Sequence, residues 1–373
     1  MIPHSHPARR DAIAGSPAAR VEARAERWGL AALVGGLLIT VVVMAGSRWS
    51  LAGGGPSLGN LAGWIASACA GLAFAASFII ESWRGHALWR RRLPMVKRLI
   101  DLLAMSLAMA MLAYLVVLAV ANLFQLGFRG LTVDALGGGA LAGAAAAAAT
   151  YAAALSGARV TTDGLATLAT LVLFIGTMAS MLSSPDESWW QLHFSQLGNV
   201  DDSSAYRFNL ALILTGLVMT VLANYVGHDL ELGLVARGVA PAGRVRTLAW
   251  LFAGIGICLI VAGVVPDAVS VPLHVGAASG MVVIFVVFVL CAVRLLPGLP
   301  AEVAGFSLFV VIGILVAVVL WVPIGYFNLT GTEFIVAGLL FAWLLVFVRA
   351  IGAYSHGEPP AEPGSSAAAA VPR

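Results

Sequence analysis

Residues 304–324 read AGFSLFVVIGILVAVVLWVPI and carry no charged side chain. A run of about 20 apolar residues is long enough for a helix to cross the hydrocarbon core of a bilayer. The chain is 60% hydrophobic and only 10% charged, whereas a soluble domain carries about 25% charged residues. Nine more apolar segments lie at residues 28–46, 60–80, 99–124, 132–155, 165–184, 208–227, 247–266, 275–293 and 333–352. We therefore predict an all-α fold, a polytopic membrane helix bundle of about ten transmembrane helices.

The basic residues are unequally distributed between the two predicted sides of the membrane. If the segments alternate in direction, eighteen of the 21 Lys and Arg residues fall on the side of the two termini. Only Arg48, Arg129 and Arg207 fall on the other side, which carries acids such as Asp201, Asp202 and Asp267. Cytoplasmic loops are enriched in Lys and Arg. Both termini are therefore predicted to be cytoplasmic, in a multi-pass protein of the cell membrane, most plausibly a bacterial plasma membrane.

The chain divides into four regions. Residues 28–160 form a four-helix membrane region, and residues 161–352 form a six-helix unit with a Trp-rich outer loop at 185–207. Residues 1–27 and 353–373 are predicted to be disordered cytoplasmic tails, because segments rich in Ala, Pro and charge bury too little apolar surface to order themselves. The apolar run that begins at Leu30 is expected to be a retained first helix rather than the core of a signal peptide.

The outer loop carries most of the polar side chains that are unusual in this chain. Residues 186–198 read DESWWQLHFSQLG and place two tryptophans, a histidine, a serine and two acids in one short connection. Polar and aromatic residues of this kind gather at membrane interfaces or around sites. If the loop is helical, Trp189 and His193 stack at i,i+4, while Trp190, Phe194 and Leu197 form an apolar stripe. The loop is then an interfacial helix, a cap over an outward-facing cavity, or both.

A shared outer site is predicted from residues of three segments. On the same outer side as the loop lie Asn209 at the start of the sixth span, Asp267 at the next outer turn and His274 at the start of the eighth span. Isolated polar side chains at that depth would lack partners. The candidate ligand-binding residues are Trp189, Trp190, His193, Ser195, Asn209, Asp267 and His274.

Three chemical alternatives remain open for these residues. Ser195 and His193 are two positions apart, which is wrong for a nucleophile and base along a helix, so a Ser–His pair needs a histidine from another segment, such as His274. Ser195 does not lie in a GxSxG nucleophile elbow. A metal site of His193, His274, Asp267 and Asp186 lacks any short paired-ligand spacing, and the sequence leaves metal binding undecided. The remaining alternative is an ordinary interfacial loop.

Other sequence features indicate packing rather than chemistry. Gly139 and Gly143 form a GxxxG motif, which lets helix backbones approach closely, either inside the bundle or at a homo-oligomer seam. Gly276 and Gly280 form a second one, which is expected to hold the nearby His274 through a close helix contact. No cofactor motif is present, so no cofactor is expected. The basic residues lie in short loops, so nucleic acid is not an expected partner.

The second half of the chain resembles a known family. Trp189-Trp190, the segment HFSQLG at 193–198, Phe208-Asn209, Pro266-Asp267 and His274 resemble the hallmarks of the multi-spanning family of domain of unknown function 998, over about residues 168–352. The resemblance implies a six-helix unit with polar residues gathered at its outer face. It implies no established activity.

The sequence supports three functional hypotheses. The preferred one is a binding or transport protein with an outward-facing polar pocket for a lipid headgroup or small solute, in contact with the bilayer. The second is a membrane-embedded lipid hydrolase or transferase, which needs a converging set of His, Asp and Ser. The third is a non-catalytic accessory membrane subunit, which needs neither a catalytic set nor a cavity.

The predicted topology is tested by cysteine labelling in intact cells. Ser188→Cys lies in the outer loop and is expected to react with a membrane-impermeant thiol reagent. His356→Cys lies near the C-terminus and is expected to react only after the membrane is permeabilised. Labelling of His356→Cys in intact cells would contradict the predicted orientation.

Overall fold

The predicted apolar segments are helices in the computed structural model, which describes residues 16–53, 55–84, 88–199 and 203–356. Within these residues, ten helices are long and apolar enough to cross a membrane. They are α2 (Pro17–Val43), α3 (Leu58–Arg84), α4 (Met95–Gly127), α5 (Ala135–Ala158), α6 (Thr162–Ser183), α7 (Ser203–Ala236), α8 (Ala242–Val264), α9 (Asp267–Leu295), α10 (Ala301–Trp321) and α11 (Leu329–His356). The chain is therefore an all-α polytopic membrane bundle, as predicted.

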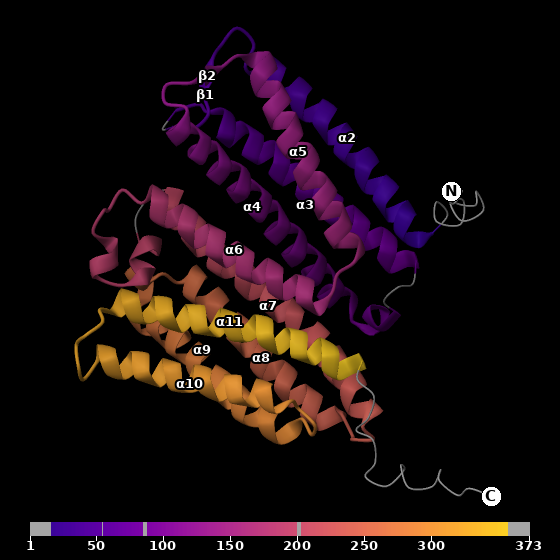
Figure 1. Cartoon of the computed structure of the whole chain (residues 1–373), viewed down its shortest axis with the longest axis vertical. Helices are drawn as coiled ribbons and strands as arrows, with labels where there is room; N and C mark the ends of the chain where they lie inside the picture. Colours follow the sequence, from indigo (N-terminus) through magenta and orange to yellow (C-terminus); the bar gives the residue numbers. More distant parts are fainter. Residues whose placement is uncertain (1–15, 54, 85–87, 200–202, 357–373) are drawn as a thin grey trace, which may run out of the picture.

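The helices form two groups that meet along α4. In the first group, α5 packs against both α2 and α3, and α3 packs against α4. In the second group, α7 packs against α6, α8 and α11, while α9 packs on α8 and α10 on α11. Helix α4 contacts α6 and α7, and so joins the groups (Figure 1). The second group is the six-helix part that carries the Trp-rich loop.

The two ends of the bundle differ in their connections (Figure 1). We call the end that carries residues 184–199 and the α8–α9 and α10–α11 turns the loop face. There a short antiparallel ribbon joins β1 (Trp49–Ser50) to β2 (Thr132–Val133). We call the opposite end, where residues 17 and 356 lie, the terminal face; it carries the 3-10 helix η1 (Leu88–Arg92).

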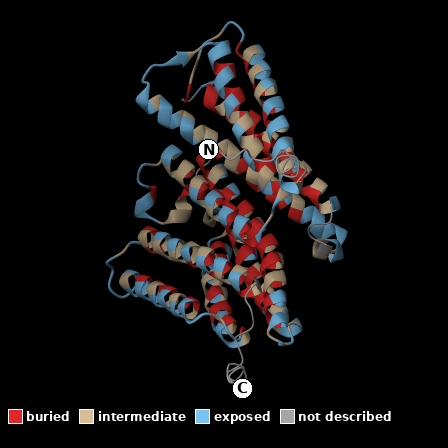
Figure 2. Ribbon diagram, turned by 45° about the vertical axis from the view of Figure 1, so that its right-hand side comes forward, coloured by how far each residue is buried: buried red, intermediate tan, exposed pale blue. Residues whose placement is uncertain are grey.

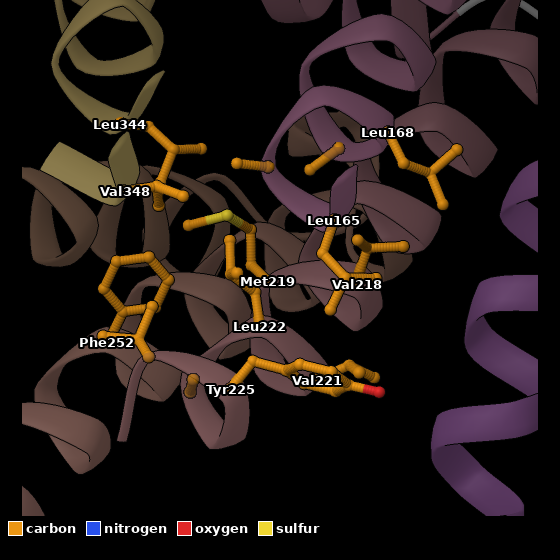
Figure 3. Close-up of a cluster of buried hydrophobic side chains, with 14 of the residues drawn as sticks. Leu165, Leu168, Val218, Met219, Val221, Leu222, Tyr225, Phe252, Leu344 and Val348 are labelled. Carbon is orange, nitrogen blue, oxygen red and sulfur yellow. The ribbon is translucent and has the colours of Figure 1, made fainter. Parts of the chain in front are cut away.

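The centre of the six-helix group is apolar and tightly packed. Side chains of α6, α7, α8 and α11 interdigitate there, among them Leu165, Val218, Phe252 and Leu344 (Figure 3). Buried positions gather along the middle of the molecule, whereas the outward faces of the helices are exposed (Figure 2). These outward faces carry many large apolar side chains, which is the surface that a helix presents to lipid tails.

Small residues bring α2 and α5 into close contact. A Cβ on Gly143 would lie 2.5 Å from the Leu33 carbonyl oxygen, and one on Gly139 would lie 3.0 Å from the Leu37 carbonyl oxygen. The GxxxG face of α5 is therefore filled by α2 of the same chain. This contact within the chain agrees with the packing interpretation of the motif, and a homo-oligomer through Gly139 and Gly143 stays a prediction.

Both tails are shorter than the sequence predicted. Helix α2 begins at Pro17, ten residues earlier than the predicted end of the tail, because Ser16 caps it and Val21 and Ala25 are buried against the bundle. At the other end α11 continues through the predicted start of the C-terminal tail, and the buried Tyr354 donates a hydrogen bond to the Pro297 carbonyl at 2.9 Å. The remaining tail residues, 1–15 and 357–373, and the acids Asp201 and Asp202 lie outside the described residues.

Candidate functional site

Residues 184–199 fold into a cap on the loop face of the six-helix group. The cap contains two 3-10 helices, η2 (Trp189–Gln191) and η3 (Phe194–Gly198), separated by the extended backbone of His193. The loop is therefore not α-helical, and the i,i+4 stacking of Trp189 on His193 that an α-helix would produce does not form. An interfacial helix with a continuous apolar stripe is not formed, because the chain turns inward at His193 instead.

Aromatic side chains anchor the cap to the bundle. Trp189 and Leu197 are buried against Phe208 of α7. Phe194 meets Trp189, Phe208 and Phe334 in edge-to-face contacts, with ring centroids 5.8, 5.6 and 6.1 Å apart. Such contacts add about 0.5–1.5 kcal/mol each to the burial of the rings. The cap is therefore a packed element whose polar side chains have fixed positions.

A break at the start of α9 brings two polar residues under the cap. Ser270 has a non-helical backbone (φ −159°, ψ 99°), and Pro272 follows it. Proline cannot donate a backbone hydrogen bond and fits best at the first turn of a helix. The regular part of α9 therefore begins near Pro272, with His274 in its first turn, while Asp267 belongs to the separate turn before the break.

His274 binds both the end of α8 and the cap. Its Nδ1 lies 3.1 and 3.0 Å from the carbonyl oxygens of Ala262 and Val265, and its Nε2 lies 2.8 Å from the Ser195 hydroxyl oxygen. Carbonyl oxygens only accept hydrogen bonds, so Nδ1 carries the proton. In the neutral ring Nε2 is then the acceptor, and the Ser195 hydroxyl donates to it. The carbonyl groups at the end of α8 thus fix the tautomer of His274.

His193 and Asp267 form a second polar pair beside the first. Their Nε2 and Oδ2 atoms are 3.2 Å apart, and the two side chains are 25% and 14% exposed. The other carboxylate oxygen of Asp267, Oδ1, is buried and has no hydrogen-bond partner among the described residues. A buried acceptor of this kind carries an uncompensated desolvation cost unless a donor binds it.

Glu333 is a site residue that the sequence prediction missed. Its Oε2 accepts a hydrogen bond from the Phe194 backbone N–H at 2.5 Å, and it lies close enough to His193, His274 and Asp267 to interact with them electrostatically. The available signal was a single acid in the first turns of an apolar helix. Such a position is ambiguous, because acids at helix ends are often only interfacial.

The remaining predicted site residues lie at the edge of this cluster. Asn209 donates to the Gly198 carbonyl at 3.0 Å and so holds the end of η3. Trp189 belongs to the aromatic anchor, whereas the side chain of Trp190 is 52% exposed. The carbonyl of Trp190 accepts a hydrogen bond from Asn328. Four of the seven predicted residues thus form two pairs: Ser195 and His274 are hydrogen-bonded, and His193 and Asp267 are at ion-pair distance. Their role in ligand binding stays a prediction.

Asp186 lies outside the cluster, on the exposed part of the cap. Its carboxylate accepts hydrogen bonds from the Ser188 hydroxyl at 2.7 Å and from the Ser188 N–H at 2.8 Å. These two bonds lower the pKa of Asp186 below its usual value. Among the described residues, no three His, Cys, Asp or Glu side chains converge closely enough to hold a metal ion. The expected close helix contact is absent at Gly276, where a Cβ would meet nothing within 4 Å, while a Cβ at Gly280 would make an ordinary contact with the Cys258 sulfur at 3.8 Å.

The chemical character of the cluster is acidic and rich in acceptors. Two carboxylates and two histidines meet under the cap, and within the described residues no Lys or Arg forms an ion pair with either carboxylate. The cluster thus combines the carboxylate oxygens of Asp267 and Glu333 with two histidine rings. It can therefore accept a cationic or donor-rich group, and the Ser195–His274 pair can hold a hydroxyl proton near a base.

Comparison with known proteins finds a family model that matches the part of the chain around this cluster. Residues 167–350 match the family model described as protein of unknown function (DUF998). The match begins in α6 and ends in α11, so it coincides with the six-helix group and includes the whole cap. The family resemblance inferred from the sequence is confirmed. No curated protein and no solved structure shows a significant match to the chain.

Loss of the Glu333 carboxylate is expected to loosen the cap. Glu333→Ala leaves the part-buried Phe194 N–H without its acceptor, which costs about 1–3 kcal/mol. We expect faster amide hydrogen exchange in residues 186–199, with unchanged exchange in the central turns of α7. The matched control is Glu187→Ala, which removes an exposed acid from the cap itself. Equal exchange in both variants would contradict the role of Glu333.

Proposed function

We propose that this membrane protein binds an amine-bearing lipid headgroup or small amine at its loop face, under the cap of residues 184–199. The observation that supports this best is the Asp267 carboxylate, whose Oδ1 is buried and has no hydrogen-bond partner among the described residues. An ammonium group supplies several N–H donors and the opposite charge, and hydrogen bonds between charged partners are about twice as strong as neutral ones.

The charge of the cluster favours a cation over an anion. Asp267 and Glu333 both face His193, and a phosphate brought to this position would be repelled by both carboxylates. The histidines accept or donate according to protonation and so adapt to the ligand. The proposal places the loop face outside the cell, in agreement with the distribution of Lys and Arg in the sequence.

The cap supplies the means of entry. The cavities at Trp89 and at Trp83 are not lined by the cluster residues, and in this proposal a ligand reaches Asp267 by displacing part of the cap. Among the described residues, the polar contacts of the cap with α9 and α11 are the Ser195–His274, His193–Asp267, Asn199–Ala268 and Phe194–Glu333 contacts. Their exchange for contacts with a ligand would open the site without unfolding the helices.

Binding is tested by the thermal stability of the purified protein with added lipid. Phosphatidylethanolamine is expected to raise the Tm, and phosphatidylglycerol, which lacks an amine, is expected to raise it less. Asp267→Asn should weaken the apparent affinity for phosphatidylethanolamine by about tenfold, the size of one lost charge-assisted hydrogen bond. The matched control, Asp186→Asn, removes an exposed carboxylate of the cap and should bind as the unmodified protein does.

Two further arms decide the outcome. Soluble ethanolamine that raises the Tm by itself identifies a small amine as sufficient, whereas an effect of the lipid alone identifies the headgroup. Equal stabilisation by phosphatidylethanolamine and phosphatidylglycerol, unchanged in Asp267→Asn, would reject the proposal.

The Ser195–His274 pair favours a second candidate, a hydrolase or transferase acting on a lipid. A serine hydroxyl that donates to a neutral imidazole is the arrangement in which a base activates a nucleophile. Here the carbonyls of Ala262 and Val265 hold the other ring nitrogen, in place of the usual carboxylate. Neutral carbonyls stabilise the imidazolium that forms during catalysis less than a carboxylate does, so the binding function is preferred.

A fluorophosphonate probe tests the second candidate directly. An activated Ser195 is expected to be labelled, and Ser195→Ala and His274→Ala should abolish the labelling. Ser188→Ala is the matched control, since Ser188 lies in the same cap but donates only to Asp186. Absence of labelling in the unmodified protein, under conditions where the cap is open to added lipid, would reject the hydrolase.

A further inference from the structure

A cavity lies at the terminal face, between the two helix groups and far from the cap. Its volume is about 570 Å³, within the range of about 300–1,000 Å³ that is typical of ligand sites. Residues from the starts of α2 and α6, from η1, and from the terminal-face ends of α3, α7 and α11 line it. The cavity therefore lies where the four-helix and six-helix groups meet, and neither group forms it alone.

Hydrogen-bond donors without partners lie in its wall. The Nε and Nη1 atoms of Arg90 and the hydroxyl of Tyr225 are buried and have no hydrogen bond of ordinary geometry to any described residue. Tyr225 is only 5% exposed. Arg90 is held in place between rings, with its guanidinium carbon 4.7 Å from the Phe78 centroid and 6.0 Å from the Tyr225 centroid. Two fixed side chains thus offer N–H and O–H groups to an acceptor.

Two helix N-termini end at the same cavity. Pro17 and Ala18 begin α2, and Thr161 and Thr162 begin α6. The N-terminus of a helix carries about half a positive charge and free backbone N–H groups, so it favours anions. The wall also contains two arginines, Arg90 and Arg159, and three acids, Glu81, Asp163 and Asp229, so the helix ends and the arginines are the groups that favour an anion.

The acids of the wall are already paired or exposed. Glu81 forms ion pairs with Arg24 at 2.8 Å and Arg84 at 3.2 Å. Asp229 accepts a hydrogen bond from the Thr162 hydroxyl at 2.5 Å. Asp163 is exposed in the first turn of α6, and Asp101 of α4 interacts electrostatically with Arg90 but lines the smaller neighbouring cavity instead. Arg90 also lies close enough to Tyr225 to interact with its hydroxyl, but Arg90 Nε and Nη1 and the Tyr225 hydroxyl make no hydrogen bond of ordinary geometry within the described residues.

The aromatic and apolar part of the wall suits the uncharged part of a ligand. Trp89 stacks on His228 with centroids 4.6 Å apart and meets Tyr225 edge-on at 5.0 Å. Val21, Val160 and Val348 add apolar surface. From the donors, the helix ends and this wall, we infer that the cavity binds a phosphate-bearing anion, with its phosphate at Arg90 and Tyr225 and its organic part against Trp89. This site is separate from the proposed function at the loop face.

The test measures binding to the full-length protein in detergent, with two probes of the same phosphate chemistry. Phosphatidylglycerol represents a lipid headgroup, and glycerol 3-phosphate represents a soluble ester. Tyr225→Phe removes only the hydroxyl and is expected to weaken binding about fivefold, and Arg90→Gln is expected to weaken it at least tenfold. Arg92→Gln is the matched control, because it removes the same charge from η1 at an exposed position that does not line the cavity.

Each result decides the inference. Stabilisation by phosphatidylglycerol alone indicates a lipid source, and stabilisation by glycerol 3-phosphate indicates a soluble one; either supports the site if Arg90→Gln and Tyr225→Phe weaken it more than Arg92→Gln does. If neither probe raises the Tm of the unmodified protein, or if all three variants respond alike, the inference is wrong. If Arg90→Gln does not fold, the comparison of Tyr225→Phe with Arg92→Gln decides the inference.

Discussion

The structure depends on one constraint, namely that a polar group in the membrane must find its partner inside the protein. The end of α8 shows how this is met. The carbonyl groups of Ala262 and Val265 have no further turn of helix to bind them, and the Nδ1–H of His274 takes that place. With Nδ1 bound in this way, the Nε2 atom of His274 faces the cap and accepts a hydrogen bond from the Ser195 hydroxyl. The His274 ring therefore both binds the free carbonyls at the end of α8 and forms part of the polar cluster.

The cap follows from the same constraint. Its backbone cannot lie unpaired against apolar helix ends, so Glu333, Asn209 and Asn328 each accept from or donate to its backbone. Its aromatic rings supply the apolar contact, and its two 3-10 helices allow His193 and Ser195 to face inward. A cap fastened by few polar contacts is stable when closed and can exchange those contacts for a ligand. In this respect the structural and functional roles of the cluster are compatible.

The sequence predicted the ten helices because apolar length is a direct consequence of bilayer thickness. It also led to His193, Ser195, Asp267 and His274, since polar residues at helix ends of one face have few other places to find partners. It did not predict the 3-10 geometry of the cap, because the i,i+4 pattern of Trp189 and His193 fits an α-helix equally well. Glu333 was missed because its partner is a backbone N–H, which leaves no mark in a sequence. The cavity at Arg90 and Tyr225 depends on how two helix groups meet, and no local pattern encodes that.

The central claim is that the Ser195–His274 hydrogen bond joins the cap to α9. A double-mutant cycle of Ser195→Ala and His274→Ala, with the free energy of unfolding measured for all four proteins, tests it most directly. The cycle removes the separate cost of uncapping α8 in His274→Ala. A coupling energy of about 1 kcal/mol is expected for one such bond. Additive effects of the two substitutions, within about 0.3 kcal/mol, would show that the cap is not held by this pair and would contradict the account.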